Sequence, residues 1–147
     1  MKTKLFFTSL FIIFIFMNIM PACQNKKIGI TDLPESSQNF IKQYFPLDSI
    51  TSITSDSKNK KYKVEFFNRS EISFNTKGSW EEINVKQNPF PIALLDILPA
   101  NLFQHLVITY PKKPISAIQK TSYGYEVKIG FSPKQEIKFN LQGDVIK

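Results

Sequence analysis

Few side chains in this sequence could perform covalent or metal chemistry. The chain has one cysteine, Cys23, and one histidine, His105. A zinc site needs three or four nitrogen, sulfur or oxygen ligands, and a serine or cysteine triad needs a histidine base beside its nucleophile. His105 stands where a similar earlier segment has Phe40, which indicates a packing position. We therefore expect no catalytic residue and no metal ligand.

Acid–base pairs and nucleotide cradles are not indicated either. Glu81 and Glu82 are neighbours, and neighbouring side chains on a strand point to opposite faces of the sheet. The five glycines show neither G-x-G-x-x-G nor P-loop spacing. The sequence thus predicts a protein that is not an enzyme and that binds no cofactor.

The N-terminal residues are typical of a secretory signal. Lys2 and Lys4 precede an apolar run from Leu5 to Met17. That run is shorter than the roughly 20 apolar residues that cross a bilayer. We therefore predict that residues 1–22 are a signal peptide.

Cys23 follows this signal directly. A single cysteine in an oxidising compartment can form no disulfide within the molecule. The sequence MPAC resembles a bacterial lipobox, with Ala22 as the small residue before the cut and Met20 and Pro21 as departures. We expect the thiol of Cys23 to carry lipid that holds the protein on a membrane. The alternative is ordinary cleavage near Ala22, which leaves a free thiol.

The residues after Cys23 predict location and charge. Residues 23–31 form the lipidated cysteine and a polar tether. Gln24 is not the aspartate of inner-membrane retention, so resemblance to lipoprotein sorting favours the periplasmic side of the outer membrane. Removal of the signal lowers the net charge from +7 to +5, and the lysines are dispersed. We expect no nucleic-acid partner.

Three aromatic residues stand outside the alternating apolar patterns: Phe67, Tyr123 and Phe131. Exposed aromatic side chains are common anchors of protein interfaces. We predict that these three residues bind a protein or peptide partner on an open sheet face. The alternative is that they pack at the ends of strands.

The elements that carry these residues occur twice. The segment LPESSQNFIKQYFP, Leu33 to Pro46, returns as LPANLFQHLVITYP, Leu98 to Pro111, 65 residues later. ISFNTKGSW, from Ile72, returns at the same offset as IKFNLQGDV. Two copies are too few for a solenoid, which needs at least about three repeats, so we expect one closed domain.

Each copy is predicted to begin with a helix. Pro34 and Pro99 suit the first helical turn, and a helix ends before a proline such as Pro46 or Pro111. The shared apolar positions fall at multiples of four and form one stripe: Leu33, Ile41 and Phe45, matched by Leu98, Leu106 and Tyr110. An amphipathic helix of about three turns is expected.

Strands are predicted after each helix, because apolar and polar residues alternate, as in Tyr62 to Phe66. One polar face indicates strands that are half exposed to water. We predict an α+β fold of two tandem helix-plus-antiparallel-strands repeats that share a sheet, with helices on one face and the other face open. Trp80 is expected in the core, opposite Val145 of the second copy.

The predicted segments are the signal (1–22), the lipidated cysteine and tether (23–31), repeat 1 (32–86), a linker (87–96) and repeat 2 (97–147). The duplicated order of Leu-Pro, aromatic-Pro, Ile-x-x-Ile, Tyr-x-Val and Ile-x-Phe-Asn-x-x-Gly resembles the PepSY-like family, which is similar to beta-lactamase inhibitor protein. The resemblance implies tandem helix-plus-sheet units and, for most members, no known function.

The predicted function is that of a non-catalytic envelope lipoprotein. It would bind a protein or peptide partner through the open sheet face, and enzyme inhibition is one form that such binding could take. The alternatives are an envelope enzyme of unknown reaction and a purely structural envelope protein. The chain lacks a pair of cysteines, so the disulfides of beta-lactamase inhibitor protein are not carried over.

Overall fold

The computed structural model describes residues 25–45, 50–86 and 90–146. The predicted signal and the predicted lipid site, Cys23, lie outside these residues, as does the start of the predicted linker. No helix among the described residues has the length and apolar character needed to cross a bilayer.

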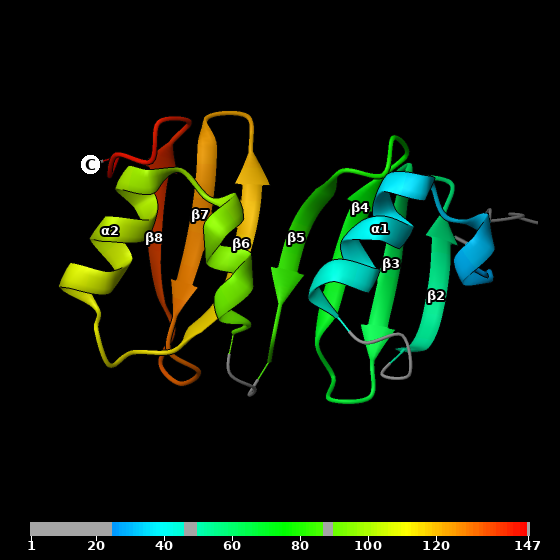
Figure 1. Ribbon diagram of the computed structural model, residues 1–147, viewed down its shortest axis with the longest axis horizontal. Coiled ribbons are helices and arrows are strands. Elements are labelled where there is room, and N and C mark those ends of the chain that lie inside the picture. Colours follow the sequence, from blue (N-terminus) through cyan, green and yellow to red (C-terminus); the bar gives the residue numbers. More distant parts are fainter. Residues whose placement is uncertain (1–24, 46–49, 87–89, 147) are drawn as a thin grey trace, which may run out of the picture.

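An antiparallel sheet of eight strands forms the body of the protein, and each strand pairs with its neighbours in sequence (Figure 1). The strands are β1 (Lys26–Lys27), β2 (Ile50–Asp56), β3 (Lys61–Phe66), β4 (Glu71–Asn75), β5 (Trp80–Asn84), β6 (Ile115–Thr121), β7 (Gly124–Ile129) and β8 (Gln135–Asn140). The two copies meet where β5 pairs with β6, with Ile83 opposite Ile118. The predicted α+β fold with one shared sheet is confirmed.

Two α-helices, α1 (Glu35–Tyr44) and α2 (Ala100–Thr109), lie over the same face of the sheet (Figure 1). Pro34 and Pro99 stand directly before them. Short 3-10 helices, η1 (Ile30–Asp32) and η3 (Ile92–Ile97), precede α1 and α2. The opposite face of the sheet carries neither α-helix and is open.

The core lies between the helices and the sheet. Phe74 and Phe139, at matching positions of the two copies, are fully buried. Phe40 of α1 contacts Phe74 edge-on at 5.7 Å between ring centroids, and the ring of His105 on α2 contacts Phe139 in the same way at 5.5 Å. Each helix therefore covers its own half of the sheet through one aromatic contact of the same kind.

A glycine turn holds each helix close to the sheet. Gly78 has a φ of +83°, and a Cβ placed there would lie 2.0 Å from Ser36 Oγ; Gly143 has a φ of +88°, and its Cβ would lie 2.6 Å from the backbone nitrogen of Leu102. The buried Ser37 hydroxyl donates a hydrogen bond to the Gly78 carbonyl at 3.2 Å. Only glycine allows both this backbone conformation and this approach.

Two sequence predictions are wrong in part. The tether predicted for residues 23–31 enters the fold early, because β1 pairs with β2 and the Ile28 amide donates to the Ile53 carbonyl at 3.0 Å. Trp80 is buried as expected, but it pairs with Phe74 across β4 and β5. Val145 bridges to Phe139 at the far edge of the sheet, so Trp80 and Val145 are equivalent residues and not opposite ones.

Candidate functional site: the open sheet face and the pocket at its end

Alternating charges cover the open face of the first copy. The Lys63 ammonium lies 2.9 Å from Glu65 Oε1 on its own strand and 3.2 Å from Glu71 Oε1 on β4. The second oxygen of Glu71 lies 3.2 Å from Lys86 Nζ. Because four charged side chains, on β3, on β4 and just after β5, satisfy one another, this part of the face is polar but nearly neutral.

Hydrogen bonds in this ladder shift the pKa values of its members. The hydrogen bond from Lys63 lowers the pKa of the Glu65 carboxyl below its ordinary value, and the Ser52 hydroxyl, which donates to Glu65 Oε2 at 2.8 Å, lowers it further. Partial burial lowers the pKa of Lys63, but the hydrogen bonds to Glu65 and Glu71 outweigh it and raise that pKa. Both groups are therefore charged at neutral pH.

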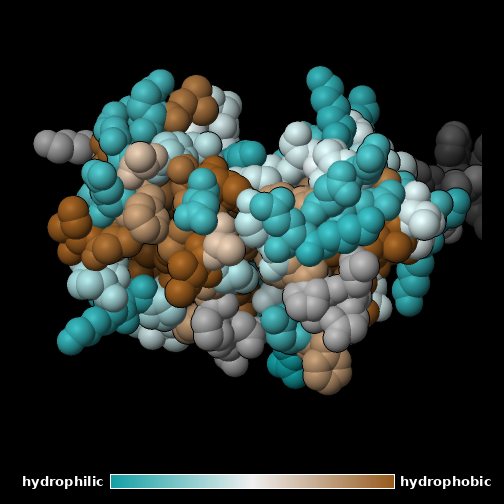
Figure 2. Space-filling view, viewed as in Figure 1, coloured by the Kyte–Doolittle hydropathy of each residue, from teal (hydrophilic) through white to brown (hydrophobic). Residues whose placement is uncertain are grey.

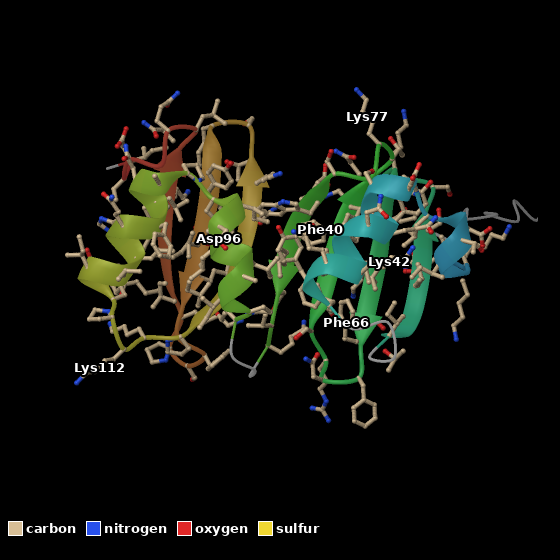
Figure 3. The ribbon with its side chains drawn as sticks, viewed as in Figure 1. Phe40, Lys42, Phe66, Lys77, Asp96 and Lys112 are labelled. Carbon is tan, nitrogen blue, oxygen red and sulfur yellow. The ribbon has the colours of Figure 1, made fainter. Side chains whose placement is uncertain are left out.

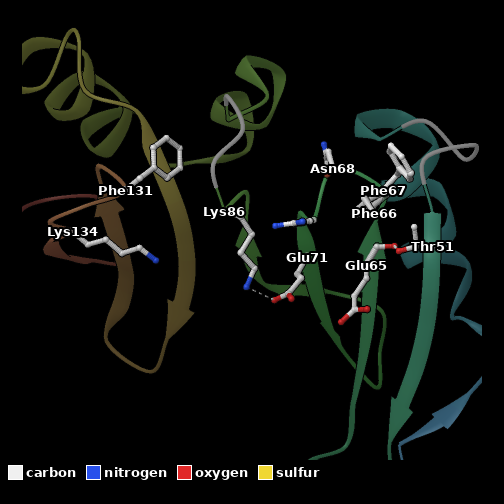
Figure 4. A pocket seen from close by; sticks show the side chains of 10 residues that line it. Thr51, Glu65, Phe66, Phe67, Asn68, Glu71, Lys86, Phe131 and Lys134 are labelled. Atoms are coloured by element: carbon white, nitrogen blue, oxygen red, sulfur yellow. Dashed lines mark hydrogen bonds and ion pairs between the residues drawn. The ribbon is translucent and has the colours of Figure 1, made fainter.

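A pocket of about 840 Å³ opens at one end of this ladder (Figure 4). The ends of β3, β5 and β7 and the starts of β2, β4 and β8 meet at this end of the antiparallel sheet. The residues that line it are Thr51, Glu65, Phe66, Phe67, Asn68, Arg69, Glu71, Lys86, Phe131 and Lys134. Residues of both copies therefore contribute to one hollow.

Two of the three predicted aromatic residues lie at this pocket. Phe67, in the β3–β4 turn, is 85% exposed, whereas Phe131, in the loop between β7 and β8, is partly buried against the core. The β3–β4 turn is fixed by hydrogen bonds from the Arg69 amide to the Phe66 carbonyl at 2.8 Å and from the Ser70 amide to Asn68 Oδ1 at 2.9 Å. The turn thus fixes the backbone that carries the exposed Phe67 ring.

Cationic residues give the pocket a positive rim that the sequence analysis missed. Lys86 is paired with Glu71, but within the described ranges no ion pair is recorded for Arg69 or Lys134. Figure 4 shows Lys134 and Phe131 on one side of the hollow and Phe67 on the other. No local sequence pattern indicates this rim, because Arg69 and Lys134 stand in turns of different copies that the strand order brings to the same end of the sheet.

Family comparison agrees with this architecture. The model of the beta-lactamase-inhibitor-like, PepSY-like family matches residues 19–66 and 60–147. The chain belongs to the PepSY-like family. The resemblance inferred from the duplicated motifs is thereby confirmed, and no curated protein matches the chain.

Solved structures of similar proteins come from Bacteroides. A protein of Bacteroides vulgatus that is described as periplasmic is 31% identical, with a TM-score of 0.74, over 86% of this chain and 97% of that one. A protein of Bacteroides thetaiotaomicron that is described as a calcium-regulated periplasmic protein is 34% identical, with a TM-score of 0.73, over 84% of this chain and 94% of that one. A third, of unknown function and 22% identical, has a TM-score of 0.72 over 84% and 98% and shows the same fold.

The remaining predicted aromatic residue of this PepSY-like chain, Tyr123, lies elsewhere. It stands in the β6–β7 turn, at the end of the sheet opposite the pocket, and is 38% exposed. Its hydroxyl hydrogen-bonds to Glu126, and this bond raises the pKa of the phenol. Tyr123 therefore does not share a surface with Phe67 and Phe131, because the strand order places the turns at opposite ends of the sheet. Its role in partner binding stays a prediction.

His105 packs as an aromatic residue. Its ring contacts that of Phe139, and its centroid lies 6.1 Å from that of the Tyr110 ring. Within the described part of this PepSY-like protein, no three histidine, cysteine, aspartate or glutamate side chains group as metal ligands would. The geometry around His105 supports the packing role that the sequence indicated.

Proposed function

We propose that this PepSY-like protein is a non-catalytic, lipid-anchored envelope protein that binds a protein partner through its open sheet face. The observation that carries the proposal is the ring of Phe67. It is 85% exposed at the rim of the pocket, on a turn fixed by its own hydrogen bonds. A large apolar side chain exposed to water on a hydrogen-bonded turn is suited to insertion into a partner.

The surroundings of Phe67 indicate the chemistry of that partner. Arg69 and Lys134 add positive charge to the rim, while Glu65 and Glu71 are already paired with lysines. Aromatic residues and arginine are enriched at the centres of protein interfaces. The site therefore suits a segment that presents an apolar side chain next to a carboxylate. Inhibition of an enzyme is one form of such binding, as the family description suggests.

The location proposed is the periplasmic side of the outer membrane, with lipid on Cys23. The similar structures are described as periplasmic proteins, which supports an envelope location. Intact-mass analysis of the mature protein should show a diacyl or triacyl adduct on Cys23. Replacement Cys23→Ser should release soluble protein or leave an uncleaved precursor. A mature chain that carries a free thiol would refute the anchor.

Partner binding is tested by saturable capture from envelope extract, followed by titration of the captured protein against variants. Phe67→Asp should abolish capture, and Lys134→Glu should weaken it, because an acidic partner would meet like charge. Leu141→Asp is the matched control, since Leu141 is also exposed (62%) and lies in the turn after β8. Equal capture by Phe67→Asp and Leu141→Asp would refute the proposed site, as would the absence of any saturable partner.

A further inference from the structure

The outward side of α2 is apolar. Phe103, Val107 and Ile108 are 37%, 49% and 77% exposed, and α2 contains no charged residue among Ala100–Thr109. Figure 2 shows hydrophobic side chains gathered over α2, whereas the surface over α1 is mostly hydrophilic. Contiguous exposed apolar surface on a small protein usually marks a contact with another body.

The fold itself does not require this surface. The positions of α1 that match Phe103, Val107 and Ile108 at the 65-residue offset are Gln38, Lys42 and Gln43. Both helices bury their inward residues, Ile41 and Leu106, against the same sheet. Since α1 packs equally well with a polar outer side, the apolar outer side of α2 contributes something other than folding.

Lysines border this surface. Lys112 and Lys113 are exposed and follow α2 directly, and Lys113 Nζ lies 5.5 Å from the centre of the Tyr110 ring. Figure 3 shows Lys112 at the end of α2, directed away from the body of the protein. An apolar helix side bordered by lysines and an aromatic ring is the arrangement found where helices lie in the headgroup region of a membrane.

The length of chain between the proposed lipid site and the fold restricts where the membrane can be. Strand β1 begins at Lys26, so three Cα–Cα steps separate it from Cys23. These steps span at most about 11 Å. If Cys23 carries lipid, as proposed above, the domain is held against the bilayer and one of its surfaces must face the headgroups.

We propose that the outward side of α2 (Phe103, Val107 and Ile108, with Lys112 and Lys113) docks on the anionic lipid bilayer that holds the anchor. The apolar side chains enter the headgroup boundary and the two lysines contact anionic headgroups. The open sheet face, on the opposite side from α2, then points away from the membrane. A second copy of the chain is a less fitting occupant, because α2 carries no acid to pair with these lysines.

The test uses an environment-sensitive NBD dye on one introduced cysteine, Ile108→Cys or, as a control on the open face, Lys138→Cys. Each labelled protein is prepared lipidated on Cys23 and, separately, as a chain that begins at Gln24. Both are mixed with vesicles of phosphatidylethanolamine and phosphatidylglycerol in a 7:3 ratio. Some of these vesicles contain spin-labelled lipid, which quenches dye only within the bilayer.

Docking predicts a blue shift of NBD emission at Ile108→Cys on vesicles without spin label, and loss of most of that emission on vesicles with spin-labelled lipid. Lys138→Cys should show neither change. The chain from Gln24 should show the same shift at higher lipid concentration. With it, Lys112→Gln/Lys113→Gln should lower vesicle partitioning about thirtyfold, because each lysine near an anionic surface contributes a factor of about five. Val107→Lys/Ile108→Gln, which places the α1 residues on α2, should abolish partitioning in an otherwise unlabelled protein.

Several outcomes would overturn the proposal. Equal and weak quenching at Ile108→Cys and Lys138→Cys would show that α2 does not face the bilayer. A blue shift that grows with protein concentration and is insensitive to the spin label would show that two copies cover the face instead. Absence of acyl mass on Cys23 refutes only the anchor, because the chain from Gln24 still reports whether α2 binds lipid.

Discussion

The two helices occupy equivalent positions on the two halves of the sheet and differ in the side chains that they expose to solvent. Phe40 on α1 and His105 on α2 make edge-on contacts with Phe74 and Phe139 at 5.7 and 5.5 Å. On their outer sides, Lys42 and Gln43 of α1 stand where α2 has Val107 and Ile108. The inner sides of the duplicated helices are constrained by packing, so they stay alike, while the outer sides are free to acquire separate tasks.

The largest effect expected from this comparison is at the matched core phenylalanines. Phe74→Ala and Phe139→Ala should each lower the free energy of unfolding by about 3 to 5 kcal/mol, because both rings are fully buried. Since β5 and β6 join the copies in one sheet, scanning calorimetry should show one transition in either variant. Phe67→Ala, at an exposed ring, is the control and should change stability little. Two separate transitions would show that the copies fold independently.

A smaller effect is expected at the two turn glycines. Gly78→Ala and Gly143→Ala should each cost about 2 kcal/mol, because a left-handed conformation is unfavourable for alanine and the new Cβ meets the helix. Adding Ser36→Ala should restore part of the loss at Gly78, since Ser36 Oγ is the nearest atom there, at 2.0 Å. No such relief is available at Gly143, where the nearest atom is a backbone nitrogen. Chemical denaturation measures the free energy of unfolding of each variant. If Ser36→Ala restored none of the loss at Gly78, the close packing of Ser36 against this turn would be contradicted.

The charge ladder should make a weaker, pH-dependent contribution in the first copy. Because the folded pKa of Glu65 is lowered from 4.5, its stabilisation is present above pH 4.5 and is lost as pH falls through the folded pKa. Glu65→Gln should therefore be less stable than the wild type by less than about 1 kcal/mol at pH 7, and equally stable at low pH. Glu126→Gln should lose less charge-pair stabilisation, because Glu126 lies 3.8 Å from Lys138 and a glutamine oxygen can still accept the hydrogen bond of the Tyr123 hydroxyl. Urea titrations between pH 2 and pH 7 test this; a difference that persists at pH 2 would refute the charge mechanism.

The smallest effect on stability is expected at the outer side of α2. Val107→Lys/Ile108→Gln should change the free energy of unfolding by less than about 0.5 kcal/mol, because both side chains are largely exposed and α1 tolerates the same residues. Thermal melts of this variant and of the reverse exchange on α1, Lys42→Val/Gln43→Ile, form the matched pair. A loss of more than about 1 kcal/mol in α2 alone would mean that Val107 and Ile108 pack within the fold.

Local patterns were sufficient for most of the fold. The spacing of Leu33, Ile41 and Phe45 predicted the helix found at Glu35–Tyr44, and the alternation from Tyr62 to Phe66 predicted β3 (Lys61–Phe66). Helical and strand periodicities depend on residues close in the chain, so a single sequence displays them. The two-residue strand β1 escaped prediction, because Lys26 and Lys27 have no apolar alternation and join the sheet only through the backbone of β2.

Only part of the candidate site could be predicted from the sequence. Phe67 and Phe131 stood out because each broke an alternating pattern, but so did Tyr123, and the sequence could not separate the three. The positive rim was missed because Arg69 and Lys134 belong to different copies. Their meeting depends on which strand ends share one edge of the sheet.

The sequence by itself determined the duplication, the helices and strands of each copy, and the residues that each copy buries, because these follow from periodicity and from the exclusion of apolar side chains from water. Only the tertiary structure decided that β5 joins β6, that Phe67 and Phe131 border one pocket, and that Tyr123 lies at the other end of the sheet. These relations arise from contacts between distant parts of the chain. Backbone hydrogen-bonding groups are alike on every strand, so they do not specify which strands pair; side-chain burial and turn geometry in the folded protein do.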